Sequence, residues 1–374
     1  MDSAPDPVLP RYGRSTLADL LPSIAARLGV PGCVDVLGLS AARSWVVLLI
    51  DGLGEHALDE HADAVPYLAS LRAGPPLTAC VPSTTATSIT SLGTGLVPGR
   101  HGVVGYTSRI PGTLSLLNAL TWDATVDPAD WQPHPSVFER VAESGGRASV
   151  VSQASFEGSG LTLVSQRGST YVAVDSVWER IGAVADLADT PGSLTYAYES
   201  RLDKAGHKHG CSSPQWVDAL RRIDLETAAL REALPTGTGL VVTGDHGFVD
   251  VPADHRVDAD AAELVEGVVL LGGEARFRHL WTAAGATDDV VAAWRASCGD
   301  RAWVVTREEA EAAGWFGPVD AAVRPRLGEV LVAARGTAAV LTPNRFPLET
   351  KMVGFHGSLT AAEMNVPLLV DTVG

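Results

Sequence analysis

The chain has 374 residues and carries 28 Lys and Arg against 44 Asp and Glu, so its formal net charge is −16. Hydrophobic residues make up 46% and charged residues 19%, the composition of a globular protein long enough for one elaborated domain or two ordinary ones. The acidic balance argues against a protein that binds the backbone of a nucleic-acid polymer, because such binding needs a basic face.

Short β-branched runs alternate along the chain with longer Ala-rich stretches. The predicted strands are Trp45–Ile50, Ala148–Ser152, Leu194–Glu199, Leu240–Thr243 and Val366–Val370. These runs are largely apolar, as is typical of strands buried on both faces of a parallel sheet. The predicted helices are Leu17–Leu28, Ser136–Ser144, Pro214–Leu234 and Ala361–Met364. The alternation predicts an α/β fold with a mostly parallel central sheet and helices on both faces.

Two stretches interrupt this alternation. The stretch from Ala275 to Gly317 has the pattern strand, helix, strand, helix. We interpret it as the centre of a small inserted α/β subdomain at about residues 256–345, with a continuation of the main sheet as the alternative. The stretch Gly105–Pro135 is rich in Pro, Thr and Trp, which favours an ordered loop near a site.

The cysteines and the N-terminal residues indicate the compartment. Cys33, Cys80, Cys211 and Cys298 lie far apart without a C-x-x-C pair, which favours free thiols in a reducing environment. Residues 1–20 contain Pro and Asp where a signal peptide has an unbroken apolar core. The longest apolar runs have the length of a strand. We therefore expect a cytoplasmic protein without a membrane partner.

Three of the predicted strands end shortly before acidic or histidine side chains that are flanked by glycine. The residues at these strand ends are Asp51, Asp203, His207, Asp245 and His246. Ligands bind outside the carboxyl ends of the strands in an open α/β sheet, so we expect these side chains to meet in one crevice. The glycines allow the backbone to turn sharply there.

These residue types are suited to a metal. Carboxylate and imidazole groups both bind Zn²⁺ and similar borderline cations. His356, in a Gly-Phe-His-Gly stretch near the C-terminus, is a sixth candidate. Six ligands exceed what one tetrahedral ion uses, which indicates a two-metal site. Taken singly, each residue is better explained as a capping Asp or a hydrogen-bonded core His, but their joint placement favours metal binding.

A candidate nucleophile lies in the hydroxyl-rich stretch Val81–Ser88, which opens a predicted helix. A hydroxyl at a helix N-terminus lies in a positive field suited to an anion, and a metal ion lowers its pKa. The alternative is an N-cap followed by solvated hydroxyls. Spacing alone does not choose among Ser83, Thr84, Thr85 and Thr87.

The motifs occur in a characteristic order. They are Asp51-Gly52, Pro-x-x-Thr with Thr-Gly-x-x-Pro-x-x-His-Gly between Pro82 and Gly102, Asp-x-x-Gly-His-x-x-Gly from Asp203, Asp-His-Gly from Asp245, and His356-Gly357. In this order they resemble the alkaline phosphatase superfamily, particularly its nucleotide pyrophosphatase/phosphodiesterase branch. The resemblance covers most of the chain and implies one alkaline phosphatase-like catalytic domain over residues 1–374.

The resemblance also implies two metal sites and a nucleophile. One site would be formed by Asp51, Thr85, Asp245 and His246, and the other by Asp203, His207 and His356. Thr85 is the implied nucleophile because it lies nine residues before Thr94-Gly95, as the family nucleophile does before its Thr-Gly. The implied cofactor is a pair of divalent ions, with Zn²⁺ expected and Mn²⁺ as the alternative.

A sulfatase is the main rival within the superfamily, because Cys80-Val81-Pro82-Ser83 has the sulfatase form C-x-P-S. However, Cys80 lies fourteen residues before Thr94-Gly95 rather than nine. Thr84 also stands where sulfatases carry an Arg. Both differences argue against the sulfatase reading.

Three positions depart from the pyrophosphatase pattern. Ala86 stands where many family members have an aromatic residue that grips a nucleobase, and Cys211 replaces a Pro. The family Asn that binds a phosphoryl oxygen aligns with Tyr106. Tyr106, or Asn118 from the same loop, is therefore the candidate substrate-binding residue.

We expect a metal-dependent hydrolase of small phosphoryl esters, acting as a phosphodiesterase or nucleotide pyrophosphatase. A phosphomonoesterase or phosphonate hydrolase on the same core is the alternative, and a non-catalytic metal- or phosphate-binding protein is the third. No Arg closely follows Thr85, which argues against monoesters because Arg grips a dianionic phosphate bidentately. Candidates for a replacement positive group are Arg276, Arg278, Arg324 and Arg326. The sequence leaves the oligomeric state open.

Overall fold

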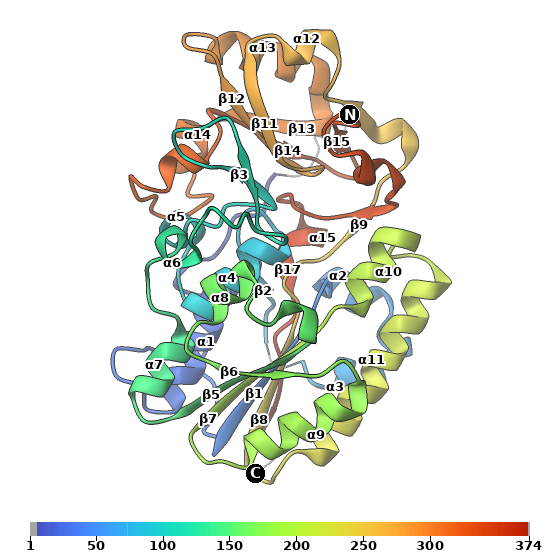
Figure 1. The fold of residues 1–374 in the computed structure, drawn as a ribbon. Helices are drawn as coiled ribbons and strands as arrows, with labels where there is room; N and C mark the ends of the chain where they lie inside the picture. The colour runs from blue at the N-terminus through green and yellow to red at the C-terminus, as the bar shows by residue number, and fades with distance from the viewer. Residues whose placement is uncertain (1–5, 73, 373–374) are drawn as a thin grey trace.

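The computed structural model describes residues 6–72 and 74–372, and its main sheet has six strands. They are β1 Ser44–Ile50, β5 Arg147–Ser152, β6 Thr170–Ala173, β7 Ser193–Glu199, β8 Thr238–Thr243 and β18 Leu369–Thr372. Their order is β18-β8-β1-β7-β5-β6 (Figure 1). All pairs are parallel except that of β18 with β8. The predicted mostly parallel α/β sheet is confirmed.

Helices cover both faces of this sheet because alternate side chains of each strand point to opposite faces. One face packs against α1 Leu17–Arg27, α4 Thr85–Thr94, α7 Val137–Glu143 and α8 Gly160–Gln166. The other face packs against α3 Pro66–Ser70, α9 Val177–Ala188 and α11 Pro214–Ala233. In β1, Val47 belongs to the first cluster and its neighbour Val46 to the second. The strand is therefore buried on both sides, as its apolar run predicts.

A second sheet is formed by part of the interrupting stretch. Its strands are β11 Val268–Glu274, β12 Phe277–Thr282, β13 Ala302–Thr306 and β14 Val330–Ala334, in the antiparallel order β11-β12-β14-β13. With α12 Ala262–Val265 and α13 Thr287–Cys298 it encloses its own apolar cluster, while α14 Arg307–Ala312 follows β13. In Figure 1 this sheet lies at the end of the molecule opposite the six-stranded sheet. Among the described residues, its strands do not extend the six-stranded sheet. The boundaries of an inserted subdomain at about residues 256–345 remain a prediction.

The remaining elements are mostly short. The helices are α2 Glu55–Glu60, α5 Pro98–His101, α6 Pro128–Trp131, α10 Arg201–His209 and α15 Ala361–Met364, with 3₁₀ turns η1 Ala62–Ala64, η2 Ala154–Phe156, η3 Ala253–His255, η4 Gly299–Arg301, η5 Arg324–Arg326 and η6 Pro347–Lys351. The strands are β2 Leu77–Thr78, β3 Thr107–Arg109, β4 Leu116–Asn118, β9 Val249–Asp250, β10 Arg256–Asp258, β15 Ala339–Leu341, β16 Gly354–Phe355 and β17 Asn365–Val366. The predicted loop Gly105–Pro135 thus contains a hairpin of β3 and β4 and the helix α6.

The expectation of one strand over Val366–Val370 is wrong. β17 ends at Val366 and pairs with β2, whereas β18 begins at Leu369 and joins the edge of the main sheet. Pro367 stands between them and has no N–H to donate to a ladder, so it interrupts the run.

Within the described ranges 6–72 and 74–372, no helix has the length and apolar character needed to cross a lipid bilayer.

Candidate active site

The first candidate ligand group lies at the carboxyl ends of β1 and β8. Asp51 follows β1, and Asp245 and His246 follow β8. Nε2 of His246 lies 3.4 Å from Oδ1 of Asp51 and 3.6 Å from Oδ2 of Asp245. All three residues are buried. Because β1 and β8 are parallel neighbours, their ends bring these side chains together, as the strand-end argument predicts.

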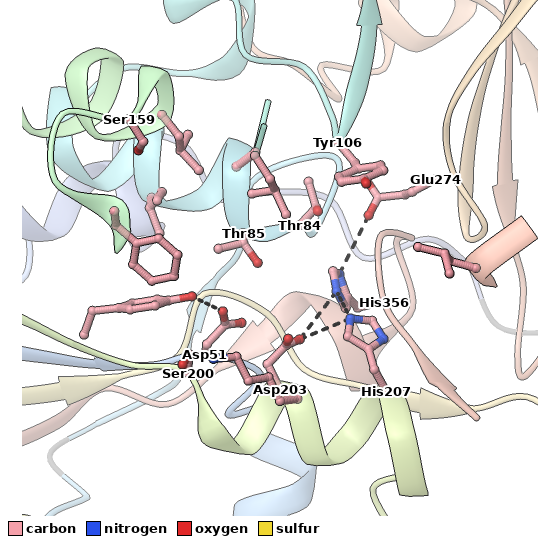
Figure 2. A pocket seen from close by; sticks show the side chains of 18 of the residues that line it. Asp51, Thr84, Thr85, Tyr106, Ser159, Ser200, Asp203, His207, Glu274 and His356 are labelled. Atoms are coloured by element: carbon pink, nitrogen blue, oxygen red, sulfur yellow. Dashed lines mark hydrogen bonds and ion pairs between the residues drawn. The ribbon is translucent and has the colours of Figure 1, made fainter. Parts of the chain in front are cut away.

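The second candidate ligand group lies beside the first (Figure 2). Asp203 and His207 are four residues apart on α10, which follows β7, and His356 comes from the turn after β16. Oδ1 of Asp203 lies 3.3 Å from Nε2 of His207 and 3.7 Å from Nε2 of His356. The ring of His356 stacks on that of His246 with centroids 3.6 Å apart, so the two groups are adjacent.

Main-chain carbonyl groups hold all three histidine rings in one tautomer. Nδ1 of His207 lies 3.0 Å from the carbonyl oxygen of Gly354, and Nδ1 of His246 lies 3.1 Å from that of Gly247. Nδ1 of His356 lies 3.1 Å from the carbonyl oxygen of Ser83. A carbonyl only accepts, so each Nδ1 carries the proton and each Nε2 presents a lone pair to the site. This is how proteins commonly orient a metal-binding histidine.

The residues fit divalent cations on two observations. Nε2 of His207 and Nε2 of His356 lie 3.2 Å apart, and with both Nδ1 atoms protonated no proton lies between these two nitrogens. Oδ1 of Asp51, Oδ1 of Asp203 and Oδ2 of Asp245 are buried without a hydrogen-bond partner among the described residues. Lone pairs and carboxylate oxygens that face one another in this way are stabilised by a cation.

The acid–base behaviour of the groups points in the same direction. Burial raises the pKa of Asp51 well above its usual range, and the nearby carboxylates of Asp203 and Asp245 add to the effect. Burial also raises the pKa of Asp203. Burial, with the neighbouring rings of His246 and His207, depresses the pKa of His356. Without a cation, burial therefore favours the uncharged forms of these three groups.

The glycines of the motifs make room for one aromatic ring. Phe248 packs against the rings of all three histidines, with centroid distances of 5.1 Å to His207, 5.7 Å to His246 and 5.2 Å to His356. Gly52, which follows Asp51, has a φ of +80°, and a Cβ there would lie 2.6 Å from the Phe248 ring. The Asp-Gly motif thus serves both the left-handed turn and the packing of this ring.

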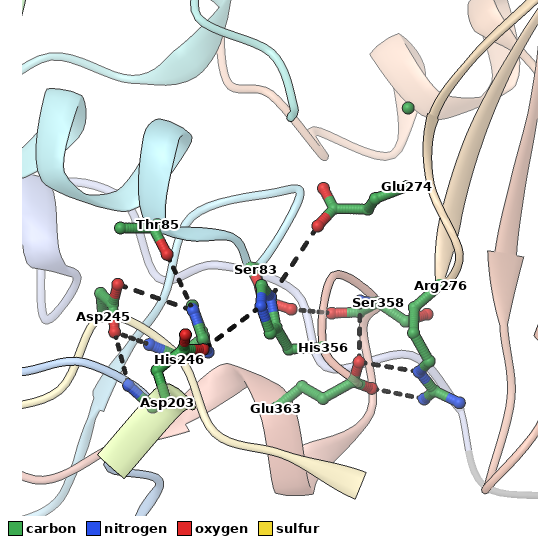
Figure 3. Close-up of polar contacts among 12 residues, drawn as sticks. Ser83, Thr85, Asp203, Asp245, His246, Glu274, Arg276, His356, Ser358 and Glu363 are labelled. Atoms are coloured by element: carbon green, nitrogen blue, oxygen red, sulfur yellow. Dashed lines mark hydrogen bonds and ion pairs between the residues drawn. The ribbon is translucent and has the colours of Figure 1, made fainter. Parts of the chain in front are cut away.

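Thr85 occupies the first position of α4, directly after the N-cap residue Thr84. Its Oγ1 lies 3.3 Å from Nε2 of His246 (Figure 3). The other candidate hydroxyls are placed differently: Oγ of Ser83 donates to the carbonyl of Ser358 at 2.6 Å, the Thr84 hydroxyl hydrogen-bonds to Glu274, and Oγ1 of Thr87 is buried without a partner among the described residues. Thr85 is therefore the hydroxyl that the fold brings to the first ligand group, at a positively polarised helix end.

A cavity of about 550 Å³ opens above both ligand groups. It is lined by Asp51, Asp203, His207, His356 and Thr85. Apolar and aromatic side chains complete much of the lining, among them Phe156, Leu161, Tyr171, Ala86, Phe346, Leu348 and Phe355, and Glu274 also belongs to it.

The two candidate substrate-binding residues, Tyr106 and Asn118, differ in their position relative to the cavity. Tyr106 lines the cavity. Oδ1 of Asn118 instead accepts the backbone N–H groups of Leu120 at 2.9 Å and Thr121 at 3.3 Å, and Asn118 is not among the lining residues. An amide that caps its own turn does not reach a ligand, so the geometry favours Tyr106.

None of the four candidate arginines is among the residues that line the cavity. Arg276 pairs with Glu363 and Arg278 pairs with Glu349, while Arg324 pairs with Glu308 and Glu311. Arg326 donates to the carbonyl of Gly102 and lies 3.8 Å above the ring of Trp131. The cationic residues among the lining set are Lys204 and Arg345, which the sequence analysis did not single out.

Other residues of the site also escaped the sequence analysis. The hydroxyl of Tyr198, the penultimate residue of β7, donates to Oδ2 of Asp51. Oε2 of Glu274 lies 3.8 Å from Nδ1 of His356, and Oε1 is buried without a partner in the described part of the chain. Tyr198 looks like an ordinary strand residue and Glu274 an ordinary strand end, so no local signal distinguishes them.

Comparison with known proteins identifies the family of the chain and shows structures with a similar fold. The family model of type I phosphodiesterase / nucleotide pyrophosphatase matches residues 45–359, most of the chain. Solved structures with a similar fold include murine ectonucleotide pyrophosphatase / phosphodiesterase 5, at a TM-score of 0.70 and 18% identity with 87% of each chain covered.

Two further structures match comparably. An inactive Thr-to-Ala variant of the murine protein in complex with AMP matches at a TM-score of 0.70 and 17% identity, with 88% of this chain and 87% of that one covered. The human protein matches at a TM-score of 0.68 and 15% identity, with 87% of each covered. The resemblance inferred from the motifs is confirmed: the chain belongs to the type I phosphodiesterase / nucleotide pyrophosphatase family and is a phosphoric ester hydrolase.

Proposed function

We propose that this protein hydrolyses small phosphodiesters or pyrophosphates, with Thr85 as the nucleophile and two divalent metal ions as cofactors. The observation that carries the proposal is the position of the Thr85 hydroxyl. It lies at the N-terminus of α4, 3.3 Å from Nε2 of His246, and faces the cavity between the two ligand groups. The relative that was crystallised with AMP is described as inactive when a Thr is replaced by Ala, which supports a threonine-dependent reaction.

The residues proposed to hold the ions divide as their contacts do. Asp51, Asp245 and His246, with Thr85, would hold one ion. Asp203, His207 and His356 would hold the other. When bound, the ions supply positive charge that lowers the pKa of the threonine hydroxyl and stabilises the phosphoryl oxygens. The mixture of oxygen and nitrogen ligands suits Zn²⁺ first and Mn²⁺ as the alternative.

The reaction proposed for Thr85 proceeds in two displacements. Oγ1 attacks phosphorus in line with the leaving group; the bond from phosphorus to Oγ1 forms as the bond to the leaving group breaks, and the departing alkoxide or phosphate takes up the proton that Thr85 loses. Water then attacks the phosphothreonine and breaks the bond from phosphorus to Oγ1; one proton of the water restores the Thr85 hydroxyl, the other passes to solvent, and the phosphate product is released. The electrostatic field at the start of α4 favours the negative charge that develops on the phosphoryl oxygens.

The lining of the cavity supports a substrate with two substituents on phosphorus. A diester or pyrophosphate carries a group on each side of the phosphoryl centre, and the cavity that contains Thr85 has a volume of about 550 Å³ and many apolar and aromatic lining side chains. Tyr106 lines the cavity, and we assign its hydroxyl the role of donor to a phosphoryl oxygen. Bidentate recognition of a monoester dianion would favour an Arg shortly after Thr85. No such Arg is among the lining residues, which argues against a monoester substrate.

Substitution of the nucleophile tests the proposal. In zinc-loaded protein, Thr85→Ala should lower kcat for bis-p-nitrophenyl phosphate by at least about 1000-fold, because it removes the proposed nucleophile. Thr85→Ser, the matched control, retains the hydroxyl and should retain most of the activity. Both variants should still bind zinc. Activity of Thr85→Ala near the wild-type level would exclude Thr85 as nucleophile.

The same preparation tests the substrate class. We expect hydrolysis of bis-p-nitrophenyl phosphate to exceed that of p-nitrophenyl phosphate at equal concentration. A much faster reaction with the monoester would replace the diester proposal with the phosphomonoesterase alternative, without changing the proposed role of Thr85.

A further inference from the structure

A buried ion pair joins the second sheet to the segment that carries His356. Arg276 lies in the turn between β11 and β12, and Glu363 lies on α15; both side chains are 0% exposed. Nε of Arg276 donates to Oε1 of Glu363 at 2.9 Å, and Nη2 donates to Oε2 at 2.5 Å. The third donor, Nη1, binds the carbonyl of Ala338. A bidentate pair of this kind fixes orientation as well as distance.

The Glu363 carboxylate also orients the turn after His356. Its Oε1 accepts the backbone N–H of Ser358 at 3.0 Å, and its Oε2 accepts the hydroxyl of Thr360 at 2.5 Å. The backbone carbonyl of Glu363 accepts the N–H of Gly247 at 2.9 Å, directly after His246. One residue therefore contacts the segments that carry a ligand of each group.

Ser358 extends these contacts to the nucleophile segment (Figure 3). Its hydroxyl donates to the carbonyl of Ala334 on β14 at 2.5 Å, and its carbonyl accepts the hydroxyl of Ser83 at 2.6 Å. The carbonyl of Ser83 in turn accepts Nδ1 of His356 at 3.1 Å. The direction of the His356 ring thus depends on Ser83 and Ser358, and through Ser358 on Glu363 and Arg276.

We infer that Arg276 and Glu363 are positioning residues that hold His356 in the orientation its metal ion requires. Arg276, which belongs to the stretch Ala275–Gly317, thereby sets the metal affinity of the second site. Neither side chain is among the residues that line the cavity, so both act through the turn of residues 356–360. The inference rests on the proposed metal centre. It explains why a charged pair is buried there, since a pair of apolar residues would fill the space without orienting the turn.

The strand that follows this turn, β12, offers a matched control. Arg278 is also 0% exposed and pairs with Glu349 on η6. Its Nε donates to the carbonyl of Val340 at 2.9 Å. Within the described part of the chain, no hydrogen bond joins Glu349 to the turns that carry His246 or His356. Arg278→Met therefore breaks a similarly buried ion pair that makes no hydrogen bond to the ligand turns.

Zinc titration of the full-length metal-free protein tests the inference. Zn²⁺ is titrated in competition with a chromophoric chelator into wild type, Arg276→Met, Arg278→Met and His356→Ala, with thermal unfolding to verify that each variant is folded. We expect two sites in wild type, one of which His356→Ala weakens. Arg276→Met should weaken that same site by at least tenfold, and Arg278→Met should leave it within twofold.

The outcomes separate the inference from the proposed function. If wild type does not bind zinc, or if His356→Ala leaves both sites unchanged, the proposed metal centre is wrong. If His356→Ala weakens one site while Arg276→Met retains wild-type affinity at both, the positioning role is wrong and the metal centre stands. Should Arg276→Met not fold, Arg276→Lys decides in its place, because Lys keeps the buried charge but cannot form the bidentate contact. Unchanged zinc affinity in Arg276→Lys would then overturn the inference.

Discussion

Glu274 shows how strongly burial acts on a single residue of this site. The side chain lines the cavity, and its Oε2 lies 3.8 Å from Nδ1 of His356. Burial raises the pKa of Glu274 to about 8. Hydrogen bonds from the Thr84 hydroxyl and the Tyr106 backbone N–H lower the pKa, but their effect is smaller than that of burial. In the metal-free protein, the folded state therefore keeps the Glu274 proton through a pH range in which the unfolded chain has lost it.

Glu274→Gln should change how the stability of the metal-free protein depends on pH. Between the ordinary Glu value of 4.5 and about 8, the folded wild type binds the extra proton, so its free energy of unfolding falls as the pH rises. Gln does not titrate. The free energy of unfolding of the variant, relative to that of wild type, should therefore rise by roughly 2–4 kcal/mol between pH 5 and pH 8. It is measured by urea unfolding in the presence of a chelator. A difference that does not change with pH would contradict the assignment.

At the residue scale, positions could be inferred where they follow from local sequence. Asp51, Asp203 and Asp245 come shortly after apolar runs, so their place near the carboxyl ends of strands could be inferred from those runs. Tyr198 and Glu274 could not be inferred, because their roles depend on partners far along the chain: Asp51 for the first and His356 for the second.

At the scale of elements, α4 is pressed closely against α8. Gly93 lies in the last turn of α4, and a Cβ there would be 1.8 Å from the carbonyl oxygen of Ser165 on α8. The main chain of α8 cannot move aside as a flexible side chain would. This contact sets how α4, and with it Thr85, lies on the sheet.

Gly93→Ala should therefore destabilise the protein although Ala favours helix. We expect a loss of about 1–3 kcal/mol in the free energy of unfolding, because overpacking outweighs helix propensity. Gly182→Ala is the matched control, since Gly182 lies in the exposed part of α9 and nothing is within 4 Å of its added Cβ. The control should gain about 0.5–1 kcal/mol. Equal responses of the two variants to denaturant would show that α4 and α8 are less tightly packed.

The strand predictions were accurate where an apolar run forms a strand with a neighbouring strand on each side in the main sheet. β1, β5, β7 and β8 lie within one or two residues of the predicted strands, since double burial makes their runs continuous. The last run failed because one proline divides it between two sheets. Similarly, the strands within Ala275–Gly317 were recognisable, but their pairing in a separate sheet depends on β14, which the predicted elements did not include.

At the scale of the whole molecule, the net charge of −16 includes several carboxyl side chains that are gathered in the candidate active site. Asp51, Asp203 and Asp245 face the same space, and Glu274 lines the cavity above them. A protein of this charge would repel a phosphoryl ester from such a crevice. The expectation that bound cations reverse the local charge is thus a condition for the proposed function.

Removal of metal should consequently destabilise the entire protein. Chelator-treated protein should unfold at a lower temperature, and Zn²⁺ should restore stability by about 2.7 kcal/mol per site when free zinc is 100 times its Kd. His207→Ala, which removes one ligand of the second group, should lose part of this zinc-dependent gain. An unfolding temperature that does not respond to zinc or chelator would contradict the metal centre.

The sequence by itself determined the alternation of strands and helices, the strand-end positions of the acidic and histidine side chains, and the family, because all three are written in local runs and spacings. Only the tertiary structure decided which residues hold those side chains in place. Phe248 beneath the three histidines, Tyr198 on Asp51, and Arg276 on Glu363 bring together segments as far as 147 residues apart. Local sequence patterns indicate which face of a helix or strand is buried. Which other element packs against that face depends on the packing of the whole chain.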